Sequence, residues 1–414
     1  MTVTLGDIER AAAAIRGAVV ETPCVRSLTL SEITGAEIWL KMENEQYTGS
    51  FKDRGALVRM LDLDEGQRRR GVIAMSAGNH AQGVAYHAKR LGIPATIVMP
   101  EGTPMVKIRS TELLGARVIL HGAGLSEAET FAHELAGREG LTFVHPYDDE
   151  RIIAGQGTVA LEMLAARPDL DMLVVPIGGG GLIAGCATAA KAIRPDIAVV
   201  GVEAALYPSM LRAIRGEDAA PGRSASDGPT IAEGIAVKRP GRLTQPIVER
   251  LVSHIALVTE AQIERGVQLL IEIEKTVAEG AGAAPLAAVL AEPERYAGRR
   301  VGLVVSGGNI DSRLLASVLM RGLVREGRLV RLRVEVSDQP GSLARITRQI
   351  ADLGANVLEV YHQRWFYDVP IKMAEVDFVL ETRDIAHMRK LVDSLTASGT
   401  RARLLSSSAQ EDDG

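Results

Sequence analysis

Short apolar runs alternate with longer helical stretches over most of the chain, and this alternation constrains the fold more than any other feature. Apolar runs without interleaved polar residues are typical of strands buried on both faces of a parallel sheet. Strand–helix alternation of this kind predicts an α/β architecture whose functional residues follow the carboxyl ends of strands. The expected strands are 38–42, 71–75, 95–99, 116–120, 172–177, 197–202 and 300–305.

The pattern changes after about Leu323, where alternating apolar and charged residues indicate a strand with one buried face. A βαββα order follows, which predicts a small antiparallel sheet with helices on one face. Ser342 is a candidate cap for the first of these helices. The expected elements are a strand at 329–336, a helix at 342–353, strands at 356–361 and 374–380, and a helix at 384–397. We therefore divide the chain into residues 1–325, residues 326–405 and a polar tail, 406–414.

Composition excludes several classes of protein. The chain of 414 residues has 47 Lys and Arg against 52 Asp and Glu, a formal net charge of −5, and only 3% aromatic residues. A mildly acidic chain without a basic run is a poor partner for nucleic acid or an anionic membrane. Its two cysteines, Cys24 and Cys186, are too few for a disulfide framework or a zinc cluster. Acidic residues stand where a signal peptide needs basic ones, so we expect a cytoplasmic protein.

The first candidate loop contains Ser50 and Lys52 in the run from Tyr47 to Ala56. Ser50 is a candidate helix cap, which would place Lys52 in the first turn of the helix. The positive helix end and partial burial both disfavour the ammonium form, so the pKa of Lys52 should be lowered. Only a free amine attacks a carbonyl carbon, which makes Lys52 a candidate nucleophile. The alternative is a surface lysine near a helix start, the commoner position for a lysine.

The second loop consists of Gly178, Gly179, Gly180 and Gly181, directly after a predicted strand. Glycines let the backbone approach a ligand closely, and the free N–H groups of the next helix would point at the loop, so we predict a phosphate site. The loop lacks the Lys-Ser or Lys-Thr pair of a nucleotide-binding P-loop, and Ile183 breaks the dinucleotide fingerprint. A tightly packed turn is the alternative, although it explains two glycines better than four.

A third loop, Ser76-Ala77-Gly78-Asn79-His80, also lies between a predicted strand and a helix. Ser76 is a candidate helix cap, and the free N–H groups of the loop could hold a carboxylate. The Asn79 amide can orient a polar substituent of a ring. From the residues alone we interpret His80 as a buried, hydrogen-bonded histidine.

A fourth loop begins at Ser306, at the end of the last predicted strand of the α/β region. This position makes Ser306 a candidate site residue, and the alternative is a serine that only forms a turn.

Together the four loops resemble the pyridoxal-phosphate enzymes of the tryptophan-synthase β-like fold (fold type II), and among them the serine/threonine ammonia-lyases. The four motifs occur in the order found in that family. The resemblance implies two parallel-sheet subdomains, with a smaller one at roughly 53–145 inserted into the larger. The turn Asp338–Leu343 and the elements around it resemble an ACT domain, an amino-acid-sensing regulatory module.

The resemblance also implies site residues. Lys52 would carry pyridoxal 5′-phosphate and act as the catalytic base. The cofactor would be held by Lys52, Phe51, Asn79, Gly178, Gly179, Gly180, Gly181, Gly234 and Ser306. The substrate carboxylate would be held by Ser76, Ala77, Gly78, Asn79 and His80.

Two acidic residues are left without a role. Glu233 stands where relatives often have an aspartate. Glu203 resembles a cation ligand of some relatives, but no partner carboxylate lies in the next several residues, so no metal is assigned. The alternative for Glu203 is a solvated loop acid.

The implied reaction is β-elimination, with L-threonine giving 2-oxobutanoate and ammonia and L-serine giving pyruvate and ammonia. Lys52 would remove the proton at Cα, and Ser306 would leave the cofactor ring weakly protonated, which disfavours transamination. A serine racemase is an alternative, but racemising relatives carry a serine where this chain has Ala77, and a methyl group transfers no proton. A hydroxyaspartate ammonia-lyase and a non-catalytic amino-acid sensor are further alternatives.

The ACT-like region implies regulation by an amino acid, and we expect isoleucine or valine because 2-oxobutanoate feeds isoleucine synthesis. ACT domains usually pair edge to edge, which covers their exposed strand edges. The chain is therefore expected to form a homo-oligomer.

Overall fold

The computed structural model describes residues 3–217, 228–363, 370 and 372–405. The chain forms two compact units, Met1–Ile310 and Asp311–Gly414. Helix α15 (Ser312–Arg325) belongs to the second unit. The domain limits at residues 325 and 405 and the subdomain limits 53–145 stay predictions, and the proposed tail at 406–414 lies outside the described residues.

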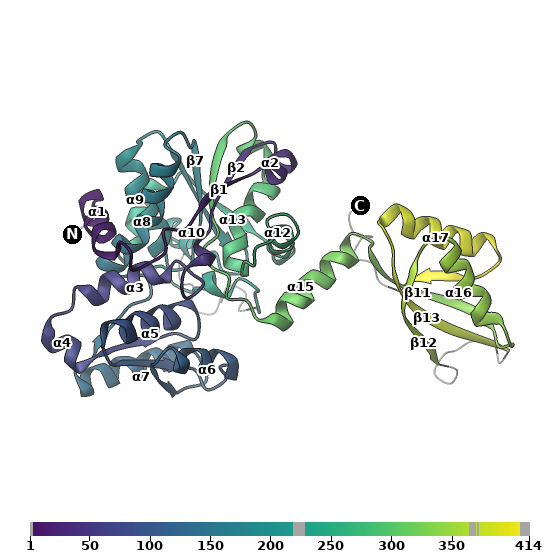
Figure 1. Cartoon of the computed structure of the whole chain (residues 1–414), viewed down its shortest axis with the longest axis horizontal. Helices are drawn as coiled ribbons and strands as arrows, with labels where there is room; N and C mark the ends of the chain where they lie inside the picture. Colours follow the sequence, from purple (N-terminus) through teal and green to yellow (C-terminus); the bar gives the residue numbers. More distant parts are fainter. Residues whose placement is uncertain (1–2, 218–227, 364–369, 371, 406–414) are drawn as a thin grey trace. The chain divides into compact units, whose positions relative to one another are not determined.

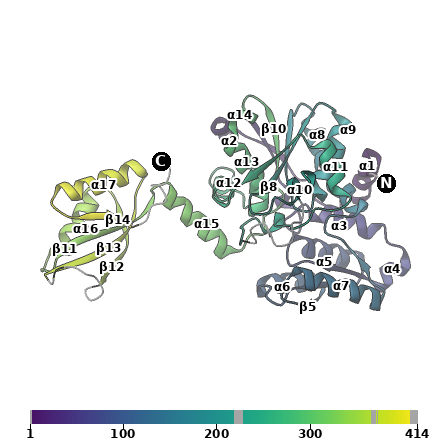
Figure 2. The same ribbon diagram turned by 180° about the vertical axis from the view of Figure 1, so that it is seen from behind.

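The larger sheet of the first unit has the strand order β1-β2-β10-β7-β8-β9. Strand β1 is antiparallel to β2, and all other neighbours are parallel. Figure 1 shows α8 and α9 on one side of this sheet and α12 and α13 on the other, and Figure 2 shows the same layers from behind. The strands are β1 (Cys24–Ser27), β2 (Glu37–Lys41), β7 (Met172–Pro176), β8 (Ala198–Ala204), β9 (His254–Val258) and β10 (Arg300–Val304).

The smaller sheet of the first unit has the order β5-β4-β3-β6, with all strands parallel. Its strands are β3 (Val72–Met75), β4 (Ala95–Met99), β5 (Arg117–Leu120) and β6 (Thr142–Phe143). Two sheets, one entirely parallel and one parallel except for β1, have separate apolar cores and confirm the predicted α/β architecture of fold type II. The apolar runs do not predict β1, β6 or β9, of which β6 is only two residues long.

The helices of the first unit cover both sheets and include two short 3-10 helices, η1 and η2. They are α1 (Leu5–Ile15), α2 (Leu28–Thr34), η1 (Glu43–Glu45), α3 (Lys52–Leu61), α4 (Glu65–Arg70), α5 (Asn79–Leu91), α6 (Met105–Leu113), α7 (Leu125–Glu139), α8 (Glu150–Ala166), α9 (Gly181–Ile193), α10 (Ser209–Ile214), η2 (Glu233–Ile235), α11 (Thr244–Leu251), α12 (Glu260–Glu272), α13 (Gly280–Ala291) and α14 (Pro293–Tyr296). Among the described residues, no helix combines the length and the apolar character needed to cross a membrane.

The second unit contains an antiparallel sheet of order β12-β13-β11-β14. Side chains of α16 and α17, such as Ile350 and Leu391, share one apolar core with alternate residues of the strands, so both helices lie on one face. The elements are β11 (Leu329–Ser337), α16 (Ser342–Asp352), β12 (Asn356–Gln363), β13 (Met373–Glu381), α17 (Ile385–Ala397) and β14 (Ala402–Leu404). The predicted βαββα order is thus extended by β14, whose three residues are too short to show a two-residue period.

All three predicted serine caps are wrong. The residue before α3 is Phe51, and the buried Ser50 hydroxyl has no hydrogen-bond partner among the described residues. Helix α5 begins at Asn79 after Gly78, and the Ser76 hydroxyl instead accepts from the Gly78 N–H at 3.1 Å. Ser342 is the first residue of α16 and follows Gly341. Helices α3 and α5 therefore start later than a capping serine requires, whereas α16 starts earlier.

Candidate functional site

The loops of Lys52 and Ser306 are joined through their backbones. The Phe51 N–H donates to the Ser306 carbonyl at 3.1 Å, and Ser50 forms an isolated antiparallel bridge with Gly307. Ser306 follows β10, so the first turn of α3 lies at the carboxyl end of the larger sheet. The structure therefore brings together two loops that lie far apart in the sequence.

Lys52 is the first residue of α3, as predicted. Its Nζ donates to the Pro146 carbonyl at 2.6 Å. Burial lowers the pKa of Lys52 to about 8, while the nearby Glu279 carboxylate acts in the opposite direction. The predicted direction of the pKa shift is confirmed, with burial as its main cause, and a substantial fraction of the amine is neutral near pH 8.

Asn79 belongs to a partly buried hydrogen-bond network that the sequence analysis missed. Its Nδ2 donates to Glu279 Oε1 at 2.7 Å, and its Oδ1 accepts from Asn309 Nδ2 at 2.7 Å. Glu279 precedes α13, and its backbone N–H donates to the Gly307 carbonyl at 3.0 Å. Burial raises the pKa of Glu279 to about 7, although the Asn79 hydrogen bond opposes the shift. The one sequence signal that could have drawn attention to Glu279 is the pair of glycines that follow it, Gly280 and Gly282, because glycines often mark tightly packed backbone.

The glycine loop lies between β7 and α9, where the positive end of α9 faces it. Gly180 has φ +96°, which side chains rarely tolerate, and a Cβ there would lie 2.6 Å from Met210 Cε and Thr244 Oγ1. A Cβ at Gly179 would lie 2.3 Å from the Tyr147 ring. Substitution at either position would therefore require the neighbouring side chains to move.

Gly234 lies beside this loop, because a Cβ at Gly178 would be 3.2 Å from the Gly234 carbonyl oxygen. Gly234 belongs to η2, next to Glu233, whose carboxylate pairs with Lys107 Nζ at 2.5 Å. The structure thus groups Gly234 with the four glycines of the loop.

His80 is 3% exposed, and its Nε2 lies 2.8 Å from the Val144 carbonyl. Burial lowers the pKa of His80 to about 3, so the ring is neutral at ordinary pH. The interpretation of His80 as a buried, hydrogen-bonded histidine is confirmed. The loop of Ser76 and Ala77 follows β3, at the carboxyl end of the smaller sheet.

Glu203 is not a solvated loop acid, contrary to the alternative considered for it. It lies in β8, is fully buried, and accepts hydrogen bonds from the Met210 and Leu211 N–H groups at 2.7 and 3.0 Å. Burial raises its pKa to about 7. Its carboxylate oxygens therefore satisfy backbone N–H groups in the first turn of α10. Within the described part of the chain, no group of three His, Cys, Asp or Glu side chains could hold a metal ion.

The arrangement suits a phosphorylated aldehyde held at two ends. Lys52 supplies an amine whose pKa is low enough for attack on a carbonyl carbon. The glycine loop supplies a tight backbone turn at a helix N-terminus, where Tyr147, Met210 and Thr244 pack so closely that a Cβ would not fit. Pro146 and Tyr147 connect the two, since one accepts from Lys52 Nζ and the other packs on Gly179.

Comparisons with known families agree with this chemistry. Residues 15–307 match the family described as "Pyridoxal-phosphate dependent enzyme", and residues 325–398 match the ACT domain family.

Individual relatives match most of the chain. The L-threonine ammonia-lyase of Thermotoga maritima is 45% identical over 403 residues, which cover 97% of this chain and 100% of that protein. The solved structure of the processed form of threonine deaminase isoform 2 from Solanum lycopersicum is 35% identical, covers 76% of this chain and 86% of its own, and has a TM-score of 0.70. A serine racemase from Dictyostelium discoideum is 35% identical, with coverages of 75% and 100% and a TM-score of 0.70.

Proposed function

The chain belongs to the family of pyridoxal-phosphate dependent enzymes and carries an ACT domain, and we propose that it is a threonine ammonia-lyase. It converts L-threonine to 2-oxobutanoate and ammonia, and L-serine to pyruvate and ammonia. The 45% identity to an L-threonine ammonia-lyase over almost the whole chain supports this choice of substrate.

The observation that carries the proposal is the placement of Lys52. Its amine has a pKa of about 8, and the residue before it is hydrogen bonded to Ser306. Such an amine would hold the cofactor aldehyde, and in its free, neutral form it would accept the Cα proton of the substrate. When bound, pyridoxal phosphate supplies an electron sink for the negative charge at Cα.

The other site residues bind and orient. Backbone N–H groups of Gly178–Gly181 would hold the phosphate, with Gly234 beside them, and Phe51 and Asn79 would contact the cofactor. The Ser306 hydroxyl would hydrogen bond to the ring nitrogen without protonating it strongly. The loop Ser76-Ala77-Gly78-Asn79-His80 holds the substrate carboxylate through backbone N–H groups and the Asn79 amide. The His80 ring contributes packing, since it is already bonded to Val144.

The function is tested by incubating the purified holoenzyme with a panel of β-hydroxy amino acids. L-Threonine, L-serine, their D-isomers and hydroxyaspartate are compared by release of 2-oxo acid and ammonia. We expect the highest kcat/KM with L-threonine and a lower value with L-serine. A preference for hydroxyaspartate, or a protein that neither absorbs in the visible range nor releases oxo acid when pyridoxal phosphate is added, would overturn the assignment.

Racemisation is the second candidate, because a serine racemase shares the fold at 35% identity. It requires a second acid–base group on the opposite ring face, where this chain carries Ala77. Chiral analysis of the amino acid left after partial turnover separates the two reactions. We expect no D-serine to accumulate from L-serine.

The ACT domain is proposed to sense a small branched amino acid, isoleucine or valine, and to take part in a homo-oligomer. Strand β12 lies at the edge of its sheet and exposes Leu358, Val360 and Tyr361 by 49%, 41% and 42%. An apolar exposed edge of this kind favours pairing with a second copy. Light scattering, with and without L-isoleucine, tests the oligomer and its response.

A further inference from the structure

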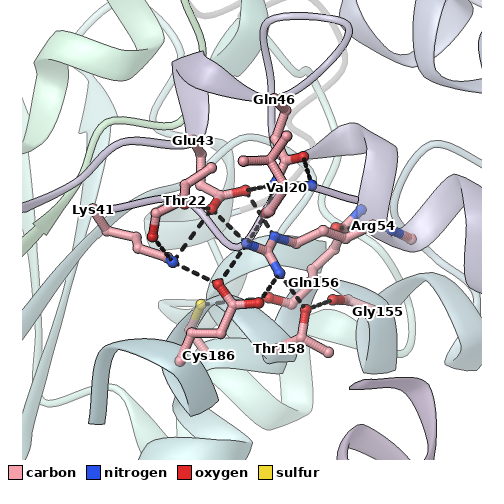
Figure 3. Close-up of polar contacts among 12 residues, drawn as sticks. Val20, Thr22, Lys41, Glu43, Gln46, Arg54, Gly155, Gln156, Thr158 and Cys186 are labelled. Carbon is pink, nitrogen blue, oxygen red and sulfur yellow. Dashed lines mark hydrogen bonds and ion pairs between the residues drawn. The ribbon is translucent and has the colours of Figure 1, made fainter. Parts of the chain in front are cut away.

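Two residues after Lys52, Arg54 lies fully buried among charged side chains (Figure 3). Its Nε and one terminal nitrogen each donate to Glu43 at 2.8 Å. Its two terminal nitrogens donate to Glu162 at 2.5 and 2.8 Å. Lys41 Nζ lies 2.5 Å from Glu162 and balances the charge. We call Lys41, Glu43, Arg54 and Glu162 the charged cluster.

The charged cluster connects three segments of the first unit to the start of α3. Lys41 ends β2, Glu43 opens η1, and Glu162 lies in α8, whereas Arg54 lies in the first turn of α3. Both carboxylates face the planar guanidinium with two oxygens, a geometry that Lys cannot reproduce. Burying charges is costly unless the geometry is well satisfied, so the position of α3 is tightly constrained.

Helices α3 and α8 are also in backbone contact at this point. A Cβ at Gly155 would lie 2.6 Å from Gly55 Cα, and the Gly55 N–H donates to Gln156 Oε1 at 3.2 Å. Helix α8 approaches α9 equally closely, since a Cβ at Gly185 would lie 2.5 Å from the Gly157 nitrogen. Figures 1 and 2 show α8 and α9 side by side. Helix α8 therefore separates α3 from α9 by a fixed distance.

The two ends of the candidate site lie on these helices. Lys52 begins α3, and Gly181 begins α9. The loop before α8 contacts both ends, through the Pro146 carbonyl at Lys52 Nζ and the Tyr147 ring at Gly179. Any movement of α3 along α8 would change the distance between the amine and the glycine loop.

We infer that Arg54 is a positioning residue for Lys52. Its paired contacts with Glu43 and Glu162 fix α3 on α8 and hold Lys52 Nζ at the distance from Gly178–Gly181 that a ligand bound at both ends requires. This inference rests on the proposed function. Misplacing a reacting group by about 1 Å costs on the order of 100-fold in rate.

The test compares three variants of the full-length chain. Glu162→Gln removes one carboxylate, keeps the side-chain size and leaves the Arg54–Glu43 contacts intact. Arg54→Lys keeps the positive charge but loses the planar guanidinium that pairs with both carboxylates. Asp171→Asn is the matched control, because Asp171 accepts three hydrogen bonds from Arg300 at the start of β7, the opposite end of the strand from the glycine loop.

Five quantities are measured for each variant: the Kd for pyridoxal phosphate, the circular dichroism per cofactor bound, kcat and KM for L-threonine, and Tm. We expect Glu162→Gln and Arg54→Lys to weaken cofactor binding, to change the dichroism band and to lower kcat by roughly 10- to 100-fold. KM should change much less. The control should lower Tm without altering the dichroism band or kcat.

The inference is wrong if both cluster variants lower Tm as the control does and keep the wild-type Kd, dichroism band and kcat, because their role is then stability alone. Failure of the proposed function is recognised separately. In that case the wild-type protein binds pyridoxal phosphate but releases no oxo acid, while the dichroism comparison still tests the placement of Lys52.

Discussion

The Phe51 N–H donates to the Ser306 carbonyl at 3.1 Å, and this hydrogen bond fixes the residue before Lys52 to the end of the last strand of the larger sheet. The neighbouring bridge between Ser50 and Gly307 continues the contact. The amine that would bind the cofactor aldehyde and the hydroxyl that would face its ring nitrogen are thus placed by one backbone pairing, which is independent of either side chain.

Lys52, and no other lysine, is expected to hold the cofactor. Borohydride reduction of the yellow holoenzyme, followed by peptide mass mapping, should find the cofactor on the peptide that contains Lys52. Lys41 serves as an internal comparison, because it is buried and its amine is already engaged in an ion pair with Glu162 at 2.5 Å. Label on a peptide that contains Lys41 and lacks Lys52 would contradict the assignment.

Gly180→Ala is expected to weaken the binding of pyridoxal phosphate by about 10-fold or more, because the new Cβ demands a strained backbone and meets Met210 and Thr244. The matched control is Gly298→Ala, which has φ +71° but nothing within 4 Å of the added Cβ. Both variants should lose similar stability from the backbone alone. A difference between their cofactor Kd values would therefore show that the glycine loop binds the cofactor. Equal Kd values for the two variants would contradict the assignment of the glycine loop as the phosphate site.

The rate at which the cofactor-free protein takes up pyridoxal phosphate is expected to rise with pH and to reach half its maximum near pH 8. Burial lowers the pKa of Lys52 to about 8, so the reactive neutral amine predominates above that pH and the ammonium below it. An unperturbed lysine would shift the midpoint toward about pH 10.

Glu279→Gln should move this midpoint to lower pH, because the Glu279 carboxylate is the group that favours the ammonium form of Lys52. The amide oxygen introduced by the substitution can still accept from Asn79. Glu294→Gln, at an exposed position in α14, serves as the control and should leave the midpoint unchanged. A shift to higher pH, or equal curves for both variants, would refute the proposed coupling.

Ser306→Asp is expected to reduce elimination and to increase transamination, since a carboxyl group beside the ring nitrogen favours its protonation and stabilises a long-lived negative charge. Ser306→Ala should lower the rate without favouring transamination. The ratio of released ammonia to aminated cofactor distinguishes the two reactions, because elimination releases the amino nitrogen and transamination leaves it on the cofactor. An unchanged rate and ratio in both variants would show that Ser306 does not face the ring.

Truncation after Gly327 is expected to abolish the response to isoleucine or valine. An effector can act only through different affinities for two states, and typical coupling is about 1–3 kcal/mol. The measurement is KM for L-threonine with and without each amino acid. A full-length enzyme that ignores every proteinogenic amino acid, and whose truncated form becomes smaller in solution, would indicate a purely structural module.

The sequence predicts the positions of the main site loops well, because buried parallel strands are continuous apolar runs and functional loops follow their carboxyl ends. It does not predict which loops touch. The Asn79–Glu279 contact depends on how the two sheets are arranged, and Glu279 follows an ordinary loop sequence. The burial of Glu203 could not be predicted from the sequence either. Its partners are two backbone N–H groups of α10, which leave no recognisable residue pattern.

The serine caps failed for a related reason. A Ser before an apolar run is compatible with several helix starts, and at Ser50 the backbone pairing with Gly307 decides which start is used. The short strand β14 is defined by its pairing with β11. Its three residues are too few to show the alternation of apolar and polar residues that predicts a strand.

The central claim is that Lys52 and bound pyridoxal phosphate together eliminate water from L-threonine. The most direct test measures 2-oxobutanoate and ammonia released from L-threonine by the wild-type holoenzyme and by Lys52→Ala, each saturated with pyridoxal phosphate. We predict equimolar 2-oxobutanoate and ammonia from the wild-type enzyme and a loss of at least about 1,000-fold in the variant, since Lys52 would serve both as anchor and as base. Equal rates from both proteins, or no oxo acid from a fully loaded wild-type enzyme, would contradict the claim.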